Sequence, residues 1–560
     1  MTKRRFHHAP NADITPDEIF LDDRNIPEFD VQQFEGRIET PIKQRTVIFL
    51  GLAFFAVGLV FLGRAGILEL GEGKFYATKS EQNRLEHQLL FPERGVIYDR
   101  RGTPLAWNAP SPEELGFSLR IYNATPGFAH VLGFLHYPAR DKNGVYYRKD
   151  YEAPVGVEAY YNDILKGKTG LRIIETDALG NVMSQNVIDP PVRGGDLRLS
   201  VDGVLQKELY AVIGAVARDQ DYLGGAGAIM DIESGEMRAL VSYPEYDPNI
   251  MTSGDDSDAI AKWSSDKHTP FLNRAVSGLY TPGSIIKPIF AIGALNEGIL
   301  TPDTLVESIG YIAIPHPYIP GEETRFNDWK AHGWLDMRSA IAQSSNVYFY
   351  EVAGGYKRQK GLGISNLEKY ARLFGYGSST GIDLFGEGVG TIPDPDWKVK
   401  NFPDDPTWRI GDTYFTGIGQ YGVQVTLLQA LREAAVIASK GIMVTPHLAE
   451  NVATSSYRLP IPESYFTVIQ EGMRKGVVEG TAKLLNVPGA KIAAKTGTAE
   501  LGVSKARVNS WVIGFFPYDK PKYAFAIVMD RGVRGNTTNA SYVAQQLFWW
   551  MLVETPEYFQ

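Results

Sequence analysis

Cysteine is absent from this chain of 560 residues. Its absence excludes disulfide bonds, thiolate zinc sites and cysteine nucleophiles. Long runs of lysine or arginine are missing too, and the formal net charge is −9. A nucleic acid is therefore not an expected partner, because nucleic-acid-binding surfaces need clustered positive charge. His332 and the loops rich in Asp and Glu show no spacing typical of metal ligands. The sequence predicts neither a metal nor another cofactor.

One stretch without charge runs from Thr46 to Gly63, and its eighteen residues are mostly apolar. A helix of this length spans roughly 27 Å, close to the hydrocarbon thickness of a bilayer. Basic residues flank both ends in equal number, so the stretch predicts a membrane anchor over residues 46–63 without fixing its direction. A buried core helix is the alternative. Residues 1–45 are polar and contain four prolines, which predicts a flexible tail rather than a cleaved signal peptide.

The rest of the chain is long enough for two domains. Residues 64–190 are rich in Gly, Pro and Tyr and predict a loop-rich α+β domain with one helical stretch near Glu158–Leu165. From residue 191 to 560 the pattern changes to that of an α/β domain. Residues 226–244 and 510–530 each predict a β-hairpin, and the segment between them is mainly helical. An antiparallel sheet built from both ends of this domain and flanked by helices is therefore expected.

The first candidate active-site element is Ser284 with Lys287, in "YTPGSIIKPIFAIGALNEG". Pro282 and Gly283 predict a turn, and the apolar residues after Ser284 predict a helix buried in the core. Residues three apart share a helix face, so Lys287 is expected within reach of the Ser284 hydroxyl. A lysine can take the serine proton only when it is neutral, which requires its pKa to fall from about 10.4 towards neutrality at a cost of about 4 kcal/mol. The same spacing occurs at Ser264–Lys267, in a polar stretch without helix signals.

Two further elements lie downstream. Ser344-Ser345-Asn346 interrupts two apolar helical runs and predicts a helix junction, with a simple helix cap as the alternative. Lys495-Thr496-Gly497-Thr498 follows a short strand of small residues that would let a ligand approach the backbone. A second Lys-Thr-Gly, at Lys168–Gly170, lies upstream of every other candidate and predicts only a turn that ends a helix.

Ser-x-x-Lys, Ser-x-Asn and Lys-Thr-Gly in this order resemble the serine penicillin-recognising enzymes. With "RGVIYDRRGTPLAWN", "VGVEAYYNDILKGKTGLR" and "MDIESGEMRALVSYPEYDPN", nearly the whole chain is similar to class B penicillin-binding proteins. The resemblance implies a membrane anchor, a pedestal of the dimerisation type and a C-terminal transpeptidase domain. "SSNVYFYEVA" is more similar to penicillin-binding protein 2 of cell elongation than to the division-specific enzymes. Tyr421 departs from the family pattern, which more often has Gly directly after Gln.

The resemblance also implies a role for each motif residue. Ser284 would attack the D-Ala-D-Ala carbonyl of a stem peptide, Lys287 would be the base, and Ser344 would relay protons. Lys495 would add positive potential. The residues expected to bind substrate are Asn346, Thr496, Gly497 and Thr498, and the backbone amides of Ser284 and Thr498 would form the oxyanion hole.

The expected surroundings follow from the same resemblance. The substrate, peptidoglycan, lies outside the cytoplasmic membrane, so residues beyond Arg64 would face outward and residues 1–45 would be cytoplasmic. β-Lactams are expected to bind, and a polytopic SEDS-family glycosyltransferase is the expected membrane partner. A D-Ala-D-Ala carboxypeptidase activity is implied together with transpeptidation.

Several alternatives share these motifs. A β-lactamase would need a route for water to the acylated serine and would have no use for an anchor and pedestal. A β-lactam sensor would need a cytoplasmic effector larger than 45 residues. A division-specific class B transpeptidase, an idle site in a structural protein and a bifunctional synthase complete the alternatives, although no region before residue 190 looks like a catalytic glycosyltransferase.

Overall fold

The computed structural model describes residues 43–111, 115–142, 144–176, 181–316 and 319–560. The chain divides into two compact units. Residues up to Glu86 together with Glu175–Val182 form the first unit, and His87–Ile174 with Met183–Gln560 form the second. Of the predicted tail, residues 1–45, positions 1–42 lie outside the described residues.

The first unit begins with a long apolar helix. α1 spans Gln44–Gly66, continues as a π-helical turn over Ile67–Gly71, and is followed by α2, Gly73–Arg84. The run Gln44–Gly71 is long and apolar enough to cross a membrane, and no residue of α1 is buried by the rest of the chain. A helix with apolar side chains around its whole circumference is costly in water and stable in lipid. α1 contains the predicted span 46–63 and extends beyond it at both ends.

The second unit is built on a five-stranded antiparallel sheet with strand order β11-β10-β20-β19-β18. Both predicted hairpins are present: β10 pairs with β11, and β19 pairs with β20. The hairpins join where β10 pairs with β20, so the sheet is assembled from both ends of the domain as predicted. The strands are β10 Gly224–Asp231, β11 Met237–Tyr243, β18 Ala493–Leu501, β19 Arg507–Phe516 and β20 Tyr523–Val533. β18 is an edge strand.

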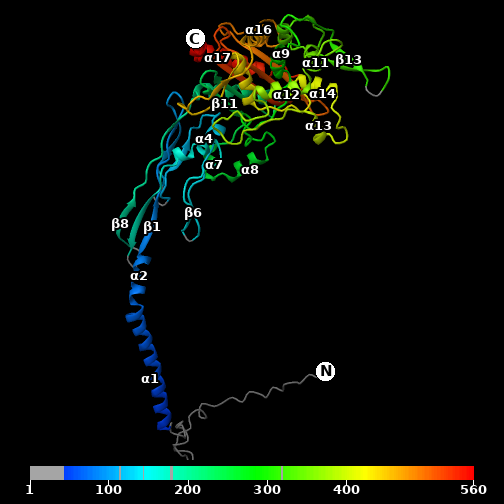
Figure 1. Cartoon of the computed structure of the whole chain (residues 1–560). Coiled ribbons are helices and arrows are strands. Elements are labelled where there is room, and N and C mark those ends of the chain that lie inside the picture. The colour runs from blue at the N-terminus through cyan, green and yellow to red at the C-terminus, as the bar shows by residue number, and fades with distance from the viewer. Residues whose placement is uncertain (1–42, 112–114, 143, 177–180, 317–318) are drawn as a thin grey trace, which may run out of the picture. The chain divides into compact units, whose positions relative to one another are not determined.

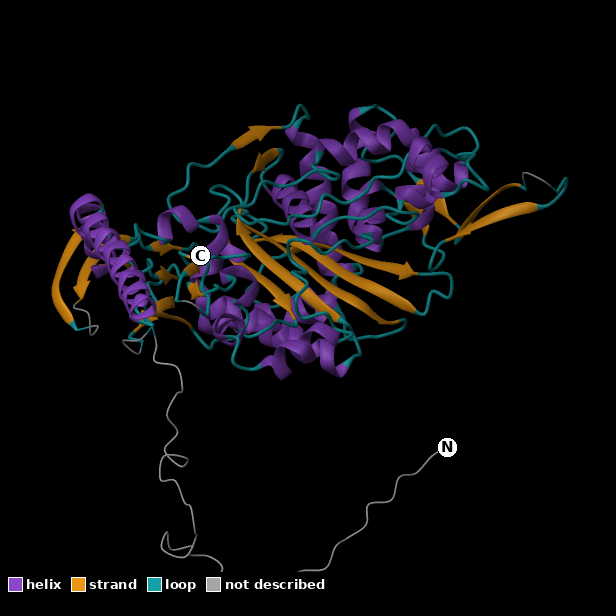
Figure 2. Cartoon of the chain, turned by 90° about the horizontal axis from the view of Figure 1, so that it is seen from below, coloured by secondary structure: helices purple, strands orange, loops and turns teal. Residues whose placement is uncertain are grey.

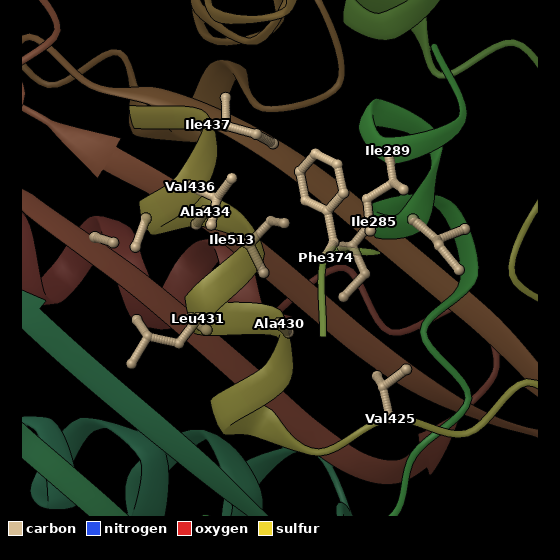
Figure 3. Packing of buried hydrophobic residues seen from close by; sticks show 14 of the residues in the cluster. Ile285, Ile289, Phe374, Val425, Ala430, Leu431, Ala434, Val436, Ile437 and Ile513 are labelled. Atoms are coloured by element: carbon tan, nitrogen blue, oxygen red, sulfur yellow. The ribbon is translucent and has the colours of Figure 1, made fainter. Parts of the chain in front are cut away.

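Helices cover both faces of this sheet (Figure 2). Neighbouring residues of β19 point to opposite faces. Val512 packs in the cluster formed with α6, Gly203–Asp219, and α17, Ala540–Glu554, whereas Ile513 packs in the cluster of α15, Leu427–Ala438. Every residue of α15 is buried, and Figure 3 shows this helix in the core beside Ile513 and Phe374.

The segment between the hairpins is mainly helical, as predicted, and its helices can be followed in Figure 1. α9 contacts α11, α12 and α16, which places the start of α9 inside the domain. The other helices of this segment are α7 Pro248–Ser253, α8 Ser257–Ser265, α9 Lys287–Asn296, α10 Met337–Gln343, α11 Asn346–Gly354, α12 Gly363–Leu373, α13 Pro395–Asn401, α14 Ile410–Gly417 and α16 Glu463–Glu479. Its short strands are β12 Val306–Ser308, β13 Tyr311–Pro315, β14 Glu323–Asn327, β15 Gly333–Leu335, β16 Ile442–Val444 and β17 Ser456–Arg458.

Short strands dominate the region before the sheet, in agreement with the loop-rich α+β prediction. β4, β3, β2 and β9 form a four-stranded sheet, and β1, β7 and β8 form a three-stranded one. The elements are β1 Leu85–Leu90, β2 Ile97–Tyr98, β3 Pro104–Ala109, β4 Leu119–Tyr122, α3 Ala129–Leu132, β5 Ala139–Arg140, β6 Tyr146–Arg148, α4 Gly156–Tyr160, α5 Asn162–Leu165, β7 Gly170–Thr176, β8 Val182–Asp189 and β9 Leu197–Arg198. The predicted helical stretch near Glu158–Leu165 is thus two short helices.

Candidate active site

Ser284 lies in a turn that packs directly against the edge strand β18. A 3₁₀ turn, Gly283–Ile286, precedes α9, so the predicted helix start is correct in place but begins with a tighter turn. Gly283 has a φ of 56°, and a Cβ added there would lie 2.8 Å from the carbonyl oxygen of Thr498. A Cβ on Gly497 would lie 2.8 Å from the carbonyl oxygen of Pro282. Only glycine permits this approach, which holds the serine beside β18.

Lys287 is fully buried at the start of α9. Its Nζ donates to the Ser344 carbonyl oxygen at 2.8 Å, to Asn346 Oδ1 at 2.8 Å and to the Ser345 carbonyl oxygen at 3.3 Å. Burial lowers the pKa of Lys287 to about 7, and the charge of Asp328 opposes that shift only in part. Lys287 lies one helical turn after Ser284, as predicted, but its Nζ makes these three hydrogen bonds and none to Ser284 in the described part of the chain. The three carbonyl-type acceptors draw the ammonium towards the Ser344 loop instead.

Ser344 lies at a helix junction, as predicted. α10 ends at Gln343, α11 begins at Asn346, and Ser344 adopts a left-handed conformation with a φ of 56°. Non-glycine residues in this conformation carry strain, and such strain is concentrated at functional sites. Ser345 caps α11 by accepting from the backbone N–H of Tyr348 at 3.3 Å. The simple cap is therefore Ser345, which leaves the Ser344 side chain for another contact.

Lys495 makes that contact. Its Nζ donates to Ser344 Oγ at 2.8 Å and to the Thr496 carbonyl oxygen at 2.7 Å. Lys495 is fully buried, and burial together with the neighbouring charge of Lys287 lowers its pKa well below the usual value, against the attraction of Glu433. Ser344 thus joins two buried lysines, one through its carbonyl oxygen and the other through its hydroxyl.

The rest of the Lys-Thr-Gly-Thr segment continues along β18. Thr496 Oγ1 lies 2.7 Å from Thr481 Oγ1, and Gly497 pairs with Trp511 of β19. Thr498 pairs with Ser510 and lines a cavity of about 210 Å³ together with Glu500, Ser510, Arg534 and Asn536. The backbone of Thr498, rather than this cavity, is what lies beside the Ser284 turn.

Two further matches to the motifs, Lys168–Gly170 and Ser264–Lys267, lie elsewhere in the fold. Lys168 forms a bridge to Val192, and Gly167, with a φ of 68°, ends α5 just before it. The predicted helix-ending turn is therefore one residue earlier, and Lys168–Gly170 leads into β7. Ser264 lies in α8, where its hydroxyl donates to the Ile260 carbonyl oxygen at 2.9 Å. The expectation that Ser264–Lys267 lacked helical structure was wrong for its first two residues.

Asp328 is a residue of this site that the sequence motifs do not reveal. Its Oδ2 accepts from Ser345 Oγ at 2.7 Å and from the Val347 backbone N–H at 3.0 Å. Its carboxylate is fully buried and lies 3.7 Å from His332 Nε2. Asp328 therefore anchors the loop that carries Ser344 and Asn346 and places a negative charge near Lys287. A lone Asp after a short strand carries no motif that would have indicated this.

Tyr421 shows how the chain accommodates its departure from the family pattern. Tyr421 has a φ of 58°, the conformation that glycine adopts most easily. Its ring stacks on Phe402 at 6.0 Å and contacts Trp397 and Trp408 at 5.8 Å each. These aromatic contacts offset the backbone strain of the loop that, through Gly419, accepts a 2.9 Å hydrogen bond from the Gly283 backbone N–H.

A serine beside an edge strand, with two buried lysines joined by a second serine, is the arrangement of a serine acyl-transferase. The family model of the penicillin binding protein transpeptidase domain matches residues 225–548, and that of the penicillin-binding protein dimerisation domain matches residues 117–199. The chain belongs to the penicillin-binding protein transpeptidase family, and its N-terminal apolar helix, dimerisation segment and transpeptidase domain are those of a class B member.

Its relatives are of the type named penicillin-binding protein 2 or MrdA. The peptidoglycan D,D-transpeptidase MrdA of Acinetobacter baumannii is 30% identical, over 91% of this chain and 89% of the relative. Penicillin-binding protein 2 of Helicobacter pylori, solved in complex with MreC, matches 84% of this chain and 99% of that chain with a TM-score of 0.70 and 27% identity. A chain from a peptidoglycan synthase complex, described as coordinating polymerization and crosslinking, matches 90% of this chain and 97% of its own length with a TM-score of 0.68 and 27% identity.

Within the described residues, no group of three or more His, Cys, Asp or Glu side chains is placed to hold a metal ion. The Nε2 of His332 lies 3.7 Å from Asp328 Oδ1.

Proposed function

We propose that this chain is a peptidoglycan D,D-transpeptidase that crosslinks stem peptides through an acyl-enzyme on Ser284. The observation that carries the proposal is the pair of hydrogen bonds by which Ser344 links Lys287 and Lys495 beside Ser284. A structural cluster would pair its buried cations with carboxylates, whereas these two lysines contact mainly neutral oxygens.

In the first step the Ser284 hydroxyl attacks the carbonyl carbon of the penultimate D-Ala, and its proton passes to Lys287. An ammonium has three N–H donors, matching the three oxygen acceptors around Lys287 Nζ. With a pKa of about 7, Lys287 is partly neutral near neutral pH and then has two donors and one lone pair. Two hydrogen bonds to the Ser344 loop can persist while the lone pair accepts the serine proton.

Collapse of the tetrahedral intermediate breaks the peptide bond and releases the terminal D-Ala. The leaving nitrogen needs a proton, which we assign to the Ser344 hydroxyl; Ser344 recovers a proton from Lys495, to which its hydroxyl is hydrogen-bonded, and the proton held by Lys287 restores the charge of the pair. The amine of a neighbouring stem peptide then attacks the acyl-enzyme ester, a new amide bond forms, and the proton of that amine passes to the serine oxygen. Ser284 is regenerated.

The other motif residues bind and stabilise. We assign the oxyanion hole to the backbone amides of Ser284 and Thr498, where loss of one donor typically costs about 3–4 kcal/mol. The Thr496 and Thr498 hydroxyls would bind the terminal carboxylate next to the charge of Lys495. Asn346 would hold a substrate amide, and Gly497 lets the turn that carries Ser284 pack against β18 beside the bound peptide.

The setting of the reaction is part of the proposal. Residues 1–45 would be a cytoplasmic tail, 46–63 the anchor in the bacterial inner membrane, 64–190 the pedestal and 191–560 the transpeptidase domain outside the cytoplasm. The MreC complex and the synthase complex of the relatives support a role in elongation with a SEDS-family polymerase as membrane partner. Carboxypeptidase activity, in which water replaces the acceptor amine, is proposed as a side reaction.

Acylation by a fluorescent penicillin tests the proposal directly. The full chain in detergent is labelled, the adduct is mapped by peptide mass spectrometry, and its lifetime is followed. A long-lived adduct on Ser284 is expected, and Ser284→Ala should abolish it. Ser264→Ala is the matched control, because Ser264 begins the other Ser-x-x-Lys sequence, and this variant should keep the adduct. An adduct elsewhere, or none, would overturn the assignment.

The same adduct separates the rival functions. Release within seconds would indicate a β-lactamase. A stable adduct without crosslinking of polymerised lipid-linked substrate, even with the partner polymerase present, would indicate a sensor or an idle site. Release of D-Ala without an acceptor would establish the carboxypeptidase reaction.

A further inference from the structure

A carboxyl group is buried in the central helix of the domain. Glu433 is a fully buried residue of α15, a helix whose other residues are mostly apolar. Oε2 accepts a short hydrogen bond from the Tyr376 hydroxyl, and Oε1 has no hydrogen-bond partner within the described residues. Burying a carboxyl with half of its acceptors unused is costly, so a role beyond packing is expected.

Glu433 and Lys495 occupy the same layer of the domain. α15 covers one face of the sheet, and Figure 3 shows Ile513 of β19 beside Ala434 of this helix. Lys495 is directly opposite Ile513 in the register of β18 and β19, so the two side chains leave the sheet on the same face. Glu433 and Lys495 interact electrostatically across this layer.

The charges around the pair are few. Tyr376, from the segment after α12, and Lys495, from β18, are the groups that act on Glu433. Lys495 is acted on by Lys287, which disfavours its charge, and by Glu433, which favours it. Arg432, the next residue of α15, donates instead to the carbonyl oxygens of Gly375 and Thr380. Asp328 acts on Lys287. Among the described residues, Glu433 is thus the acid that can support the charge of Lys495.

We propose that Glu433, held by Tyr376, is a positioning residue that keeps Lys495 charged and directed at Ser344 during acylation. The inference rests on the proposed transpeptidase function. The two groups act on each other through charge, and no bond is made or broken between them. Burial raises the pKa of Glu433 well above its usual value, and burial together with Lys287 lowers that of Lys495, while the carboxylate and the ammonium each favour the charged form of the other.

Substrate binding would act in the same direction as Glu433. The terminal carboxylate of a stem peptide, or the carboxylate of a penicillin, brings a negative charge to the Lys-Thr-Gly strand. That charge favours the ammonium form of Lys495, as does the carboxylate of Glu433, which Tyr376 holds by a hydrogen bond.

The test is the pH profile of Ser284 acylation in the full chain, measured with a fluorescent penicillin. In Glu433→Gln, which keeps the shape and the hydrogen bond from Tyr376, Lys495 loses its supporting acid and becomes neutral at lower pH. The alkaline limb of the profile, where the acylation rate falls as Lys495 loses its proton, is expected to move to lower pH by roughly one unit. Tyr376→Phe is expected to move it in the same direction by less, because the carboxylate loses its hydrogen bond.

Glu351→Gln is the matched control. Burial also raises the pKa of Glu351, to about 7, but its charged neighbour is Lys357 and not an active-site lysine. Its profile is expected to match the wild type.

An unchanged alkaline limb in folded Glu433→Gln, or an equal shift in Glu351→Gln, would overturn the inference. If Glu433→Gln does not fold, an unchanged limb in Tyr376→Phe would overturn it. A wild-type chain that forms no adduct on Ser284 would overturn the proposed function as well, whereas a labelled wild type with unshifted variants overturns this inference alone.

Discussion

Two buried clusters of charge in the second unit differ in how the charges are paired. In the first, the Glu158 carboxylate receives Arg94 Nε at 2.6 Å and Arg120 Nε at 2.8 Å, and all three side chains are fully buried. In the second, the ammonium groups of Lys287 and Lys495 contact serine and asparagine oxygens and backbone carbonyls, with no carboxylate within salt-bridge distance in the described part of the chain.

The pKa values move accordingly. Burial opposes the charge of Glu158, but the two guanidinium groups outweigh it, and its pKa lies below the usual range. Burial also opposes the charge of Lys287, and the attraction of Asp328 is too weak to compensate, so the pKa falls to about 7. A paired buried charge stays charged and holds structure, whereas an underpaired one can exchange a proton near neutral pH. The pairing, rather than burial alone, separates the structural cluster from the active site.

The largest effect should follow from removing the underpaired charge. Lys287→Met keeps an unbranched side chain but removes the base, so acylation of Ser284 should slow by about 10²–10⁴-fold. The rate is measured per folded molecule with the fluorescent penicillin, and thermal unfolding confirms that the variant is folded. A variant that labels at the wild-type rate would show that another group takes the serine proton.

Removing the paired charge should instead destabilise the fold. Glu158→Gln leaves two buried guanidinium groups without a counter-charge, which should cost about 3–5 kcal/mol in the free energy of unfolding. The folded fraction should still acylate at the wild-type rate. Urea unfolding of the full chain in detergent measures the first effect, and active-site titration at low temperature measures the second. A stable variant with slow acylation would contradict the distinction between the clusters.

The sign of the pH dependence follows from the lowered pKa of Glu158. Its stabilising contribution is fully present above the ordinary carboxyl pKa of about 4.3 and is lost as the pH falls through the lower folded value. The difference in stability between wild type and Glu158→Gln should therefore shrink in acid.

The sequence was sufficient for the parts of the site that lie within motifs. Spacing and order predict Ser284, Lys287, Ser344 and Lys495 as site residues, and hydrogen bonds join the last three, with Ser284 one turn before Lys287. The hairpins that form the sheet were predicted because alternation along a strand is a local signal. The first Lys-Thr-Gly, predicted to be a turn because it follows a helical stretch upstream of every other candidate, lies between α5 and β7.

Contacts between distant segments could not be predicted in the same way. Arg94 and Glu158 each lie in a segment that supported the resemblance, but their pairing joins positions 64 residues apart. Asp328 and Glu433 carry no motif, and each acts by being buried near a lysine that the chain supplies from another element. The partners of Lys287 Nζ could not be predicted for the same reason, because the loop oxygens that accept its hydrogen bonds come from a separate segment.

The smallest effect is expected from Asp328, whose carboxylate favours the charged form of Lys287 only in part. In the wild type, acylation should rise with pH as Lys287 loses its proton around pH 7. Asp328 favours the charged form of that lysine, so Asp328→Asn should lower its pKa further and move the acid limb of the profile to lower pH. The maximal rate should fall far less than in Lys287→Met, because an asparagine oxygen can still accept from Ser345 and the Val347 backbone N–H. The pH profile of penicillin acylation measures both quantities. An acid limb that stays in place or moves to higher pH would mean that Asp328 anchors the Ser344 loop without acting on the charge of Lys287.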